Sequence, residues 1–187
     1  MLASRQLPEF TVTLTTVSRL IEQFKGTMYH REALPDIAST NEIDRFHWMP
    51  REHMVILVYL VTVMQSMQAG MLDRAKRSAE KALIQIEKLS VFDTSPLLTV
   101  FHLSLLEHTA MGRLVMGVQT AAAQDIGQAC RLCQTNPILM YKRLPQLHTL
   151  IGLYAMSMNC MSQAENQFKY ALRVSCNFII LISSFNL

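Results

Sequence analysis

The chain has 187 residues, of which 50% are hydrophobic and 17% are charged, and its formal net charge is +3. This composition excludes a disordered protein, because disordered chains are poor in apolar residues and carry a high net charge. Six glycines and six prolines are too few for the turns of a small all-β sandwich. The mild charge also argues against a nucleic-acid-binding protein, which favours a clustered basic face.

The low charged fraction indicates either a large core or apolar surface that a partner covers. Residues 1–9 read MLASRQLPE and lack the apolar segment of a secretory signal. The longest apolar stretch, at 54–64, has 11 residues, far fewer than the roughly 20 that cross a bilayer. Four unevenly spaced cysteines are then most simply reduced thiols, and we expect an intracellular protein without membrane contact.

The first predicted helix covers residues 13–24, where apolar residues recur at helical spacing. A polar stretch follows it and reads as a loop. We therefore expect residues 1–45 to hold a partial repeat, in which helix 13–24 is the second helix of a preceding hairpin, and then this polar loop.

Three later helices share one set of start and stop signals. Each starts at a proline, which suits the first helical turn because its missing N–H would have no partner there: Pro50, Pro96 and Pro145. Each ends at a residue that tolerates positive φ: Gly70, Gly117 and Asn159. The pattern predicts helices at 50–69, 96–116 and 145–158.

A second pattern follows each stop in a constant register. Positions five, nine, twelve and thirteen residues after the stop hold matching residue types, with small residues at the first and third: Ala75, Ala79, Ala82 and Leu83; Ala122, Ile126, Ala129 and Cys130; Ala164, Phe168, Ala171 and Leu172. Small residues let two helices approach closely. This is the second-helix pattern of a tetratricopeptide (TPR) hairpin, and Gly152 stands at that motif's packing glycine.

These copies predict an all-α fold, a TPR-like helical-hairpin solenoid that forms a fragment of a right-handed superhelix. Three degenerate hairpins would fill residues 46–174, at 50–89, 96–134 and 145–174. The stops lie 47 and 42 residues apart, against about 34 in the standard repeat, so we expect irregular connections at 88–95 and 135–144. The alternative is an ordinary helical bundle in which small residues recur by chance.

Residues 175–187 form a divergent apolar tail. It includes the uncharged string NFIILISSFNL, which is rich in strand-forming residues, so we do not expect it to continue the helix. Neither end of the chain shows the polar cap that a solenoid needs. We therefore expect a fragment or an alternative product of a longer protein.

Four strings carry a resemblance to a known family. They read FHWMPREHMVILVYLVTVMQSMQAG at 46–70, AEKALIQIEKL at 79–89, LLEHTAMGRLV at 105–115 and QLHTLIGLYAMSMNCMSQAENQF at 146–168. From about residue 46 to 173 the chain closely resembles the helical-repeat subunit of the cohesin loader, the Mau-type chromatid cohesion factor. The tail from Ser175 departs from the family pattern, and full-length members are far longer.

The resemblance implies a non-enzymatic scaffold in the nucleus. Its superhelix would wrap the extended N-terminal segment of a Nipped-B-like cohesin-loader subunit, and the pair would load cohesin onto chromatin and so support sister chromatid cohesion. We expect no cofactor and no direct sequence-specific contact with nucleic acid.

The candidate partner-binding residues lie on the first helix of each hairpin, if these helices line the concave side as in related arrays. Leu, small polar residues and unbranched Met, which adapts to irregular surfaces, suit an extended peptide. The alternative is that Met at helical spacing belongs to the core. The predicted residues are Leu57, Leu60, Met64, Met67, Glu107, Met111, Leu114, Leu153 and Met156, and the same face carries Ser104, Gln146 and Thr149.

Other clusters favour structural roles. Cys130 and Cys133 form a C-x2-C inside a predicted helix, whereas structural zinc sites usually have two tight pairs on turns. Six scattered histidines match no catalytic motif, so we predict no metal site and no catalytic site. A basic stripe is interleaved with acidic residues, which indicates a solvated helix face rather than a DNA contact: Arg74, Arg77, Lys81 and Lys88.

Two rival functions need features that the projected face lacks. A generic TPR adaptor for chaperone C-termini would clamp a carboxylate with Lys, Arg and Asn side chains. A helical-repeat RNA-binding protein would need a basic groove and base-reading polar pairs. An enzyme is the least favoured class, because no nucleophile, base or metal set is assembled.

Overall fold

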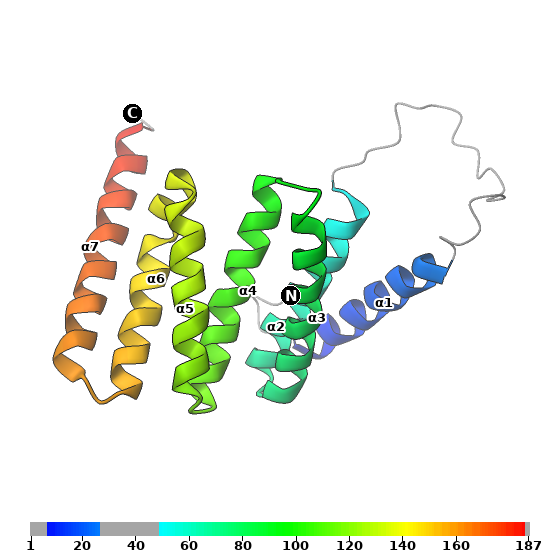
Figure 1. Ribbon diagram of the computed structural model, residues 1–187, viewed down its shortest axis with the longest axis horizontal. Helices are drawn as coiled ribbons and strands as arrows, with labels where there is room; N and C mark the ends of the chain where they lie inside the picture. Colours follow the sequence, from blue (N-terminus) through cyan, green and yellow to red (C-terminus); the bar gives the residue numbers. More distant parts are fainter. Residues whose placement is uncertain (1–6, 27–48, 186–187) are drawn as a thin grey trace.

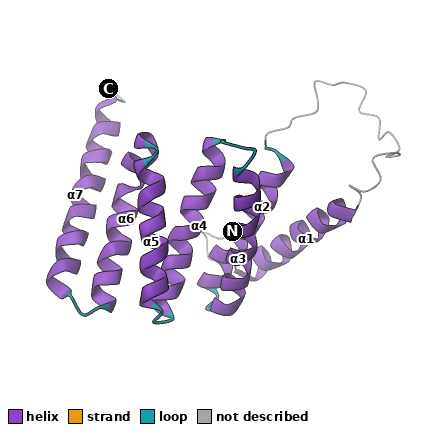
Figure 2. Cartoon of the chain, in the orientation of Figure 1, coloured by secondary structure: helices purple, strands orange, loops and turns teal. Residues whose placement is uncertain are grey.

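The structure is a computed structural model that describes residues 7–26 and 49–185. This part of the chain contains seven α-helices and no strand (Figures 1 and 2), which confirms the all-α prediction. The helices are α1 (Leu7–Gly26), α2 (Arg51–Gln68), α3 (Leu72–Ser90), α4 (Pro96–Val115), α5 (Gln119–Gln134), α6 (Pro137–Ser157) and α7 (Met161–Phe185). None of the described helices is long and apolar enough to span a membrane.

Helices α2 to α7 form three pairs that stand side by side in a row (Figure 1). The most extensive contacts join α6 with α7, α2 with α3, and α4 with α5. Within the described ranges, contacting helices are never more than two places apart in chain order. A closed bundle would also bring the first and last helices together, so these helices form an open row.

The turn inside each pair has the same backbone conformation. Its central residue has a positive φ, of 72° at Gly70, 74° at Gly117 and 61° at Asn159. The following residue donates its N–H back to a carbonyl five residues earlier, at 2.8 Å each time: Met71 to Ser66, Val118 to Arg113 and Cys160 to Ala155. This is the Schellman motif, and the three predicted helix stops are confirmed.

The small residues of the second helices are buried, as their spacing predicts. Each of the predicted alanines is at most 6% exposed: Ala75, Ala79, Ala82, Ala122, Ala129, Ala164 and Ala171. Gly152 on α6 faces Phe168 on α7, and a Cβ added to this glycine would lie 2.5 Å from the Phe168 ring. Because real Cβ atoms do not approach other atoms so closely, the ring requires glycine there. The predicted packing glycine is confirmed.

The prediction that Pro145 opens a helix is wrong, because α6 starts at Pro137. The Asn136 side chain accepts a hydrogen bond from the Leu139 N–H at 3.2 Å and caps the helix, and Pro137 follows at the first helical position. Pro145 lies inside the helix. The expected irregular connection at 135–144 is therefore limited to the two residues between α5 and α6.

The expectation that the tail leaves the helical period is also wrong, because α7 continues to Phe185. No glycine or proline interrupts residues 161–185, and β-branched residues lower helix propensity by only a fraction of a kcal/mol each. At the other end, α1 starts at Leu7, earlier than the predicted helix 13–24. Most of the predicted polar loop lies outside the described residues, and the grouping of the helices into repeat units stays a prediction.

Candidate functional site

The two sides of the row differ in how closely their helices pack. The first helices of the pairs contact one another, since α2 contacts α4 and α4 contacts α6. Across the described residues, the second helices α3, α5 and α7 make no such contacts with each other. All nine predicted partner-binding residues belong to α2, α4 and α6, the closely packed side.

The predicted partner-binding residues of α2 lie in the core or pack against it. Leu60 is 7% exposed and belongs to a cluster with Ile56 and Val63, so it offers little surface to a partner. Leu57, Met64 and Met67 are partly buried and pack against the same cluster. Leu60 therefore packs as a core residue, and its part in partner binding stays a prediction.

Helices α4 and α6 expose more of their predicted residues. Met111 on α4 is 38% exposed and Met156 on α6 is 43% exposed. Leu114 and Leu153 are partly buried. Glu107 is only 9% exposed, although it lines a cavity.

A cavity of about 380 Å³ brings residues of α4 and α6 together. Four of its lining residues were projected onto one face from the sequence: Glu107, Met111, Gln146 and Thr149. The remaining lining residues are His108, Pro145, Leu150 and Ser175. A second cavity, of about 220 Å³, lies among α2, α3, α4 and α5 and includes Met67. The structure therefore joins part of the predicted face into one hollow between two pairs.

Arg143 on α6 binds two residues of α4, one of which is Glu107. Its Nη1 donates to Glu107 Oε2 at 3.2 Å, and its Nη2 donates to Ser104 Oγ at 3.1 Å. Burial raises the pKa of Glu107, and the positive charge of Arg143 partly opposes that rise. The sequence did not point to Arg143, because residues 135–144 were predicted to form an irregular connection rather than a helix facing α4.

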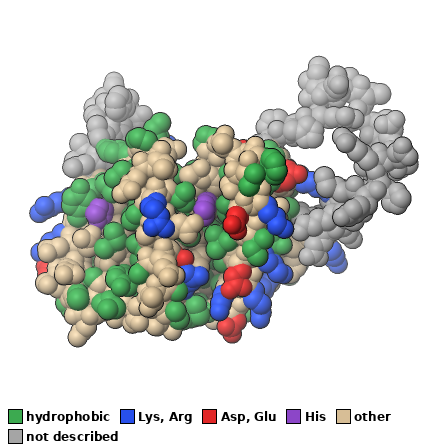
Figure 3. Space-filling model, viewed as in Figure 1, with side chains coloured by type: hydrophobic (Ala, Val, Ile, Leu, Met, Phe, Trp, Pro, Cys, Tyr) green, Lys and Arg blue, Asp and Glu red, His purple; other side chains and the backbone are tan. Residues whose placement is uncertain are grey.

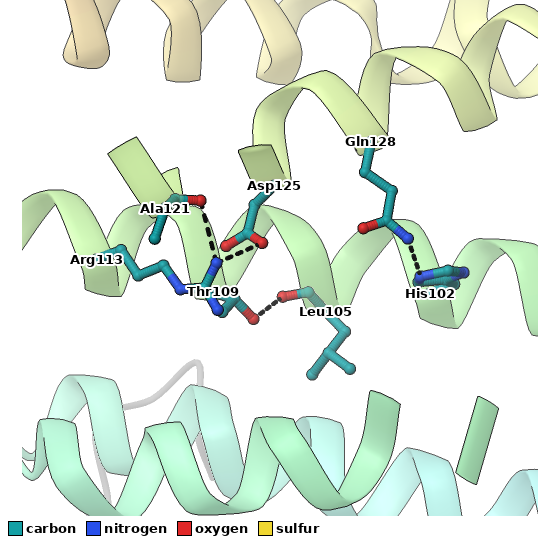
Figure 4. Close-up of polar contacts among 7 residues, drawn as sticks. All are labelled: His102, Leu105, Thr109, Arg113, Ala121, Asp125 and Gln128. Carbon is teal, nitrogen blue, oxygen red and sulfur yellow. Dashed lines mark hydrogen bonds and ion pairs between the residues drawn. The ribbon is translucent and has the colours of Figure 1, made fainter. Parts of the chain in front are cut away.

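A second buried ion pair lies within the α4–α5 pair (Figure 4). The Arg113 Nη1 donates to Asp125 Oδ1 at 2.7 Å and to the Ala121 carbonyl at 3.0 Å. Burial raises the pKa of Asp125, and Arg113 opposes that rise. Gln128 Nε2 donates to His102 Nε2 at 3.3 Å (Figure 4), and burial lowers the pKa of His102. These contacts hold α4 against α5.

The cysteines and the basic stripe occupy the places that their sequence patterns predict. Cys130 and Cys133 lie on α5, and burial raises the pKa of Cys133 to about 11. Within the described ranges, no three His, Cys, Asp or Glu side chains gather as metal ligands. Arg77, Lys81 and Lys88 are exposed and Arg74 is partly buried, and in Figure 3 basic and acidic side chains stand next to one another over α3.

Comparison with known proteins identifies the family. The sequence model of a family described as cohesin loading factor matches residues 6–177, which is most of the chain. The chain belongs to the cohesin loading factor family. This confirms the resemblance that the four sequence strings carry.

Relatives in this family are longer than the chain. It is 46% identical over 139 residues to a MAU2 chromatid cohesion factor homolog from Nematostella vectensis, which covers 74% of the chain and 23% of the relative. It is 46% identical over 134 residues to the homologs from Drosophila yakuba and Drosophila melanogaster, over 71% of the chain and 21% of each relative. The chain thus spans less than a quarter of these relatives. No solved structure matches it.

Proposed function

We propose that this chain acts as a non-enzymatic scaffold in a cohesin-loading complex. The side formed by α2, α4 and α6 binds an extended segment of a Nipped-B-like subunit, in the nucleus, where the pair supports cohesin loading on chromatin and sister chromatid cohesion. The observation that carries this proposal is the cavity between α4 and α6, where four residues of the predicted face meet. Membership of the cohesin loading factor family supports the assignment of the chain to a cohesin-loading complex.

The packing of the pairs supports a TPR-like solenoid, and a right-handed superhelix is part of the same proposal. Three identical turns and the buried alanines repeat along the row. In a curved stack, the helices on the inner side lie closer together than those on the outer side. Because α2, α4 and α6 contact one another whereas α3, α5 and α7 do not, the first helices are assigned to the concave side.

The alternative is a generic TPR-type adaptor unrelated to cohesin. Such a protein would clamp the terminal carboxylate of its ligand with basic side chains. Among the described residues that line the α4–α6 cavity there is no Lys or Arg, and the one formally charged residue is the acidic Glu107. This lining disfavours recognition of a carboxylate.

The test measures binding of the Nipped-B-like N-terminal segment to the 187-residue chain by isothermal titration calorimetry. Met111→Glu and Met156→Glu each place a charge on an exposed residue of the first-helix side, and each should weaken binding by about tenfold or more. Ile84→Glu is the matched control, because Ile84 is 53% exposed on α3. Met64→Glu is less suitable, since Met64 packs against the core.

The control variant should bind as the wild-type chain does. Equal loss in all three variants would show that the charge acts on the whole fold rather than on one face. A wild-type chain that does not bind the segment, yet binds unrelated C-terminal peptides, would favour the generic adaptor.

A further inference from the structure

The cavity between α4 and α6 has a polar lining that is unbalanced in its hydrogen-bonding groups. We propose that this cavity accepts a lysine or arginine side chain of the extended partner segment, and that the Glu107 carboxylate recognises it. The inference rests on the proposed function and adds to it the chemistry by which one position of the partner is selected.

The charge of the lining favours a cation. Of the described residues that line the cavity, Glu107 is the one with a formal charge, and about nine-tenths of it is buried. Arg143 pairs with its Oε2 but does not line the cavity. A basic side chain that enters would therefore meet a largely buried carboxylate, and near a buried charge the attraction of opposite charges is stronger than in bulk water.

One carboxylate oxygen remains without a partner. Glu107 Oε1 is buried and accepts no hydrogen bond from the described residues. A buried acceptor that lacks a donor is unfavourable, because folding has removed its water without a replacement. Glu107 lines the adjoining cavity, so a donor of the partner that enters the cavity comes next to this residue, and a charged donor forms the stronger hydrogen bond. Because Oε1 has almost no exposed surface, pairing through Oε1 requires a shift of the Glu107 side chain.

The other polar groups of the lining with assigned hydrogen bonds present lone pairs. The hydroxyl of Thr149 donates to the Pro145 carbonyl at 2.8 Å, and that of Ser175 donates to the Ala171 carbonyl at 2.9 Å. His108 Nδ1 lies 2.7 Å from the Ser104 carbonyl, which can only accept, so Nδ1 donates to that carbonyl. Gln146, which also lines the cavity, offers both a donor and an acceptor through its amide. The acidic Glu107 and the lone pairs of the two hydroxyls therefore make the lining richer in acceptors than in donors, which suits a ligand rich in N–H groups.

The apolar part of the lining suits the remainder of a basic side chain. Met111, Pro145 and Leu150 contribute apolar surface to the cavity. Lysine and arginine carry three or four methylene groups that pack on such surface while the charged end reaches a polar partner. An acidic side chain would instead face Glu107 and the lone pairs described above, and a purely apolar one would offer no donor to the Glu107 carboxylate.

Asp125 provides a matched control for Glu107. Both are buried acids that pair with an arginine through one oxygen, and in both the second oxygen has no partner among the described residues. Burial raises the pKa of both. Only Glu107 lines the α4–α6 cavity. A loss of binding that follows Glu107 and not Asp125 would therefore come from the cavity rather than from a buried ion pair in general.

The experiment titrates the Nipped-B-like N-terminal segment into the wild-type chain and into its Glu107→Gln and Asp125→Asn variants. In parallel, each Lys and Arg of the segment is changed to Met, one at a time, and titrated into the wild-type chain. We expect one basic position whose change weakens binding about tenfold or more. Glu107→Gln should weaken binding of the wild-type segment by a similar factor, and Asp125→Asn should leave it unchanged.

The combination of the two changes is the sharpest readout. Once Glu107→Gln is in place, the Lys or Arg to Met change at the selected position should have little further effect, because both changes remove the same interaction. The segment scan needs no alteration of the chain, so it stands even if the Glu107→Gln variant does not fold, which circular dichroism would show.

The outcomes separate the two proposals. If the wild-type chain binds the segment but every basic position tolerates Met within about threefold, the cavity inference is overturned and the proposed function stands. The same holds if a Gln at the selected position binds as well as Lys or Arg, since a neutral donor then suffices. If the wild-type chain does not bind the segment, both proposals fall.

Discussion

Helices α3 and α7 hold the same place in their pairs but meet different surroundings. Leu83 on α3 packs against two successive core clusters, one shared by α2, α3 and α4 and one shared by α4, α5 and α6. Leu172, thirteen residues after its turn as Leu83 is, is 65% exposed on α7. The difference teaches that the repeated pattern determines packing inside a pair, whereas burial of its outer side depends on a neighbouring pair.

The largest expected effect on stability comes from substitutions at this shared position of the two helices. Leu83→Ala should lower the free energy of unfolding by about 2 kcal/mol, because it removes packing from two clusters. Leu172→Ala should change it by less than about 0.5 kcal/mol, as expected for an exposed residue. Urea unfolding of the two variants beside the wild-type chain measures both. Equal losses would mean that Leu172 is packed in solution.

A glycine inside the third pair gives the next effect. Gly152→Ala should lower the free energy of unfolding by about 1–2 kcal/mol, since the added methyl group collides with the Phe168 ring. Gly127→Ala on α5 is the control, because its added Cβ meets only the flexible end of Arg131 at 3.8 Å. The free energy of unfolding of this control should rise by about 0.5–1 kcal/mol, because alanine has a higher helix propensity than glycine. A stabilising Gly152→Ala would contradict the close approach of α6 and α7.

The turns of the first and third pairs offer a smaller contrast. Gly70→Ala should lower the free energy of unfolding by about 1 kcal/mol, because alanine is strained at the φ of 72° found there. Asn159→Gly should be neutral or slightly stabilising, since glycine adopts the φ of 61° with less strain. Thermal unfolding of both variants tests the prediction. A loss in Asn159→Gly would indicate a contact of the asparagine side chain beyond its backbone conformation.

The smallest effect is the pH dependence of the Glu107 site. Its pKa is raised in the folded chain, so the folded state binds the proton more tightly than the unfolded state does. The contribution of Glu107 to stability is therefore greatest below about pH 4 and declines as the pH rises through the folded pKa. The free energy of unfolding of the Glu107→Gln variant should therefore rise relative to that of the wild-type chain as the pH increases from about 4 to 7. Unfolding at several pH values tests the sign, and a variant that loses stability relative to the wild-type chain as the pH rises would contradict it.

Much of the fold could be predicted from local sequence signals. Gly70, Gly117 and Asn159 take the positive φ that their places at helix ends indicate. Ala75 and its counterparts are buried because only small residues allow the two helices of a pair to approach. Such features depend on a few neighbouring residues, so their spacing alone reveals them.

The errors arose where two local signals compete. Pro137 and Pro145 are both acceptable helix starts, and the Asn136 side chain decides between them by capping the earlier one. In α7, strand-forming residues continue an established helix because no breaker ends it. Since propensities differ by only fractions of a kcal/mol, sequence composition could not predict where that helix ends.

The candidate site was only partly predictable. Helical spacing placed Glu107 and Met111 on one face with Gln146 and Thr149, and these four residues line one cavity. The same spacing also selected Leu60, which belongs to the core. The contact of Arg143 with Glu107 joins residues 36 positions apart, and it depends on how α4 and α6 pack rather than on any local pattern.

The most direct test of the account is site-specific photocrosslinking of the chain to the Nipped-B-like segment. A photoreactive phenylalanine analogue would replace Met111 or Met156 on the first-helix side, and Ile84 or Leu172 on the second-helix side, all of which are exposed. We predict covalent adducts with the segment from the first two positions and none from the other two. Adducts from Ile84 and Leu172 in place of Met111 and Met156 would contradict the assignment of α2, α4 and α6 as the binding side.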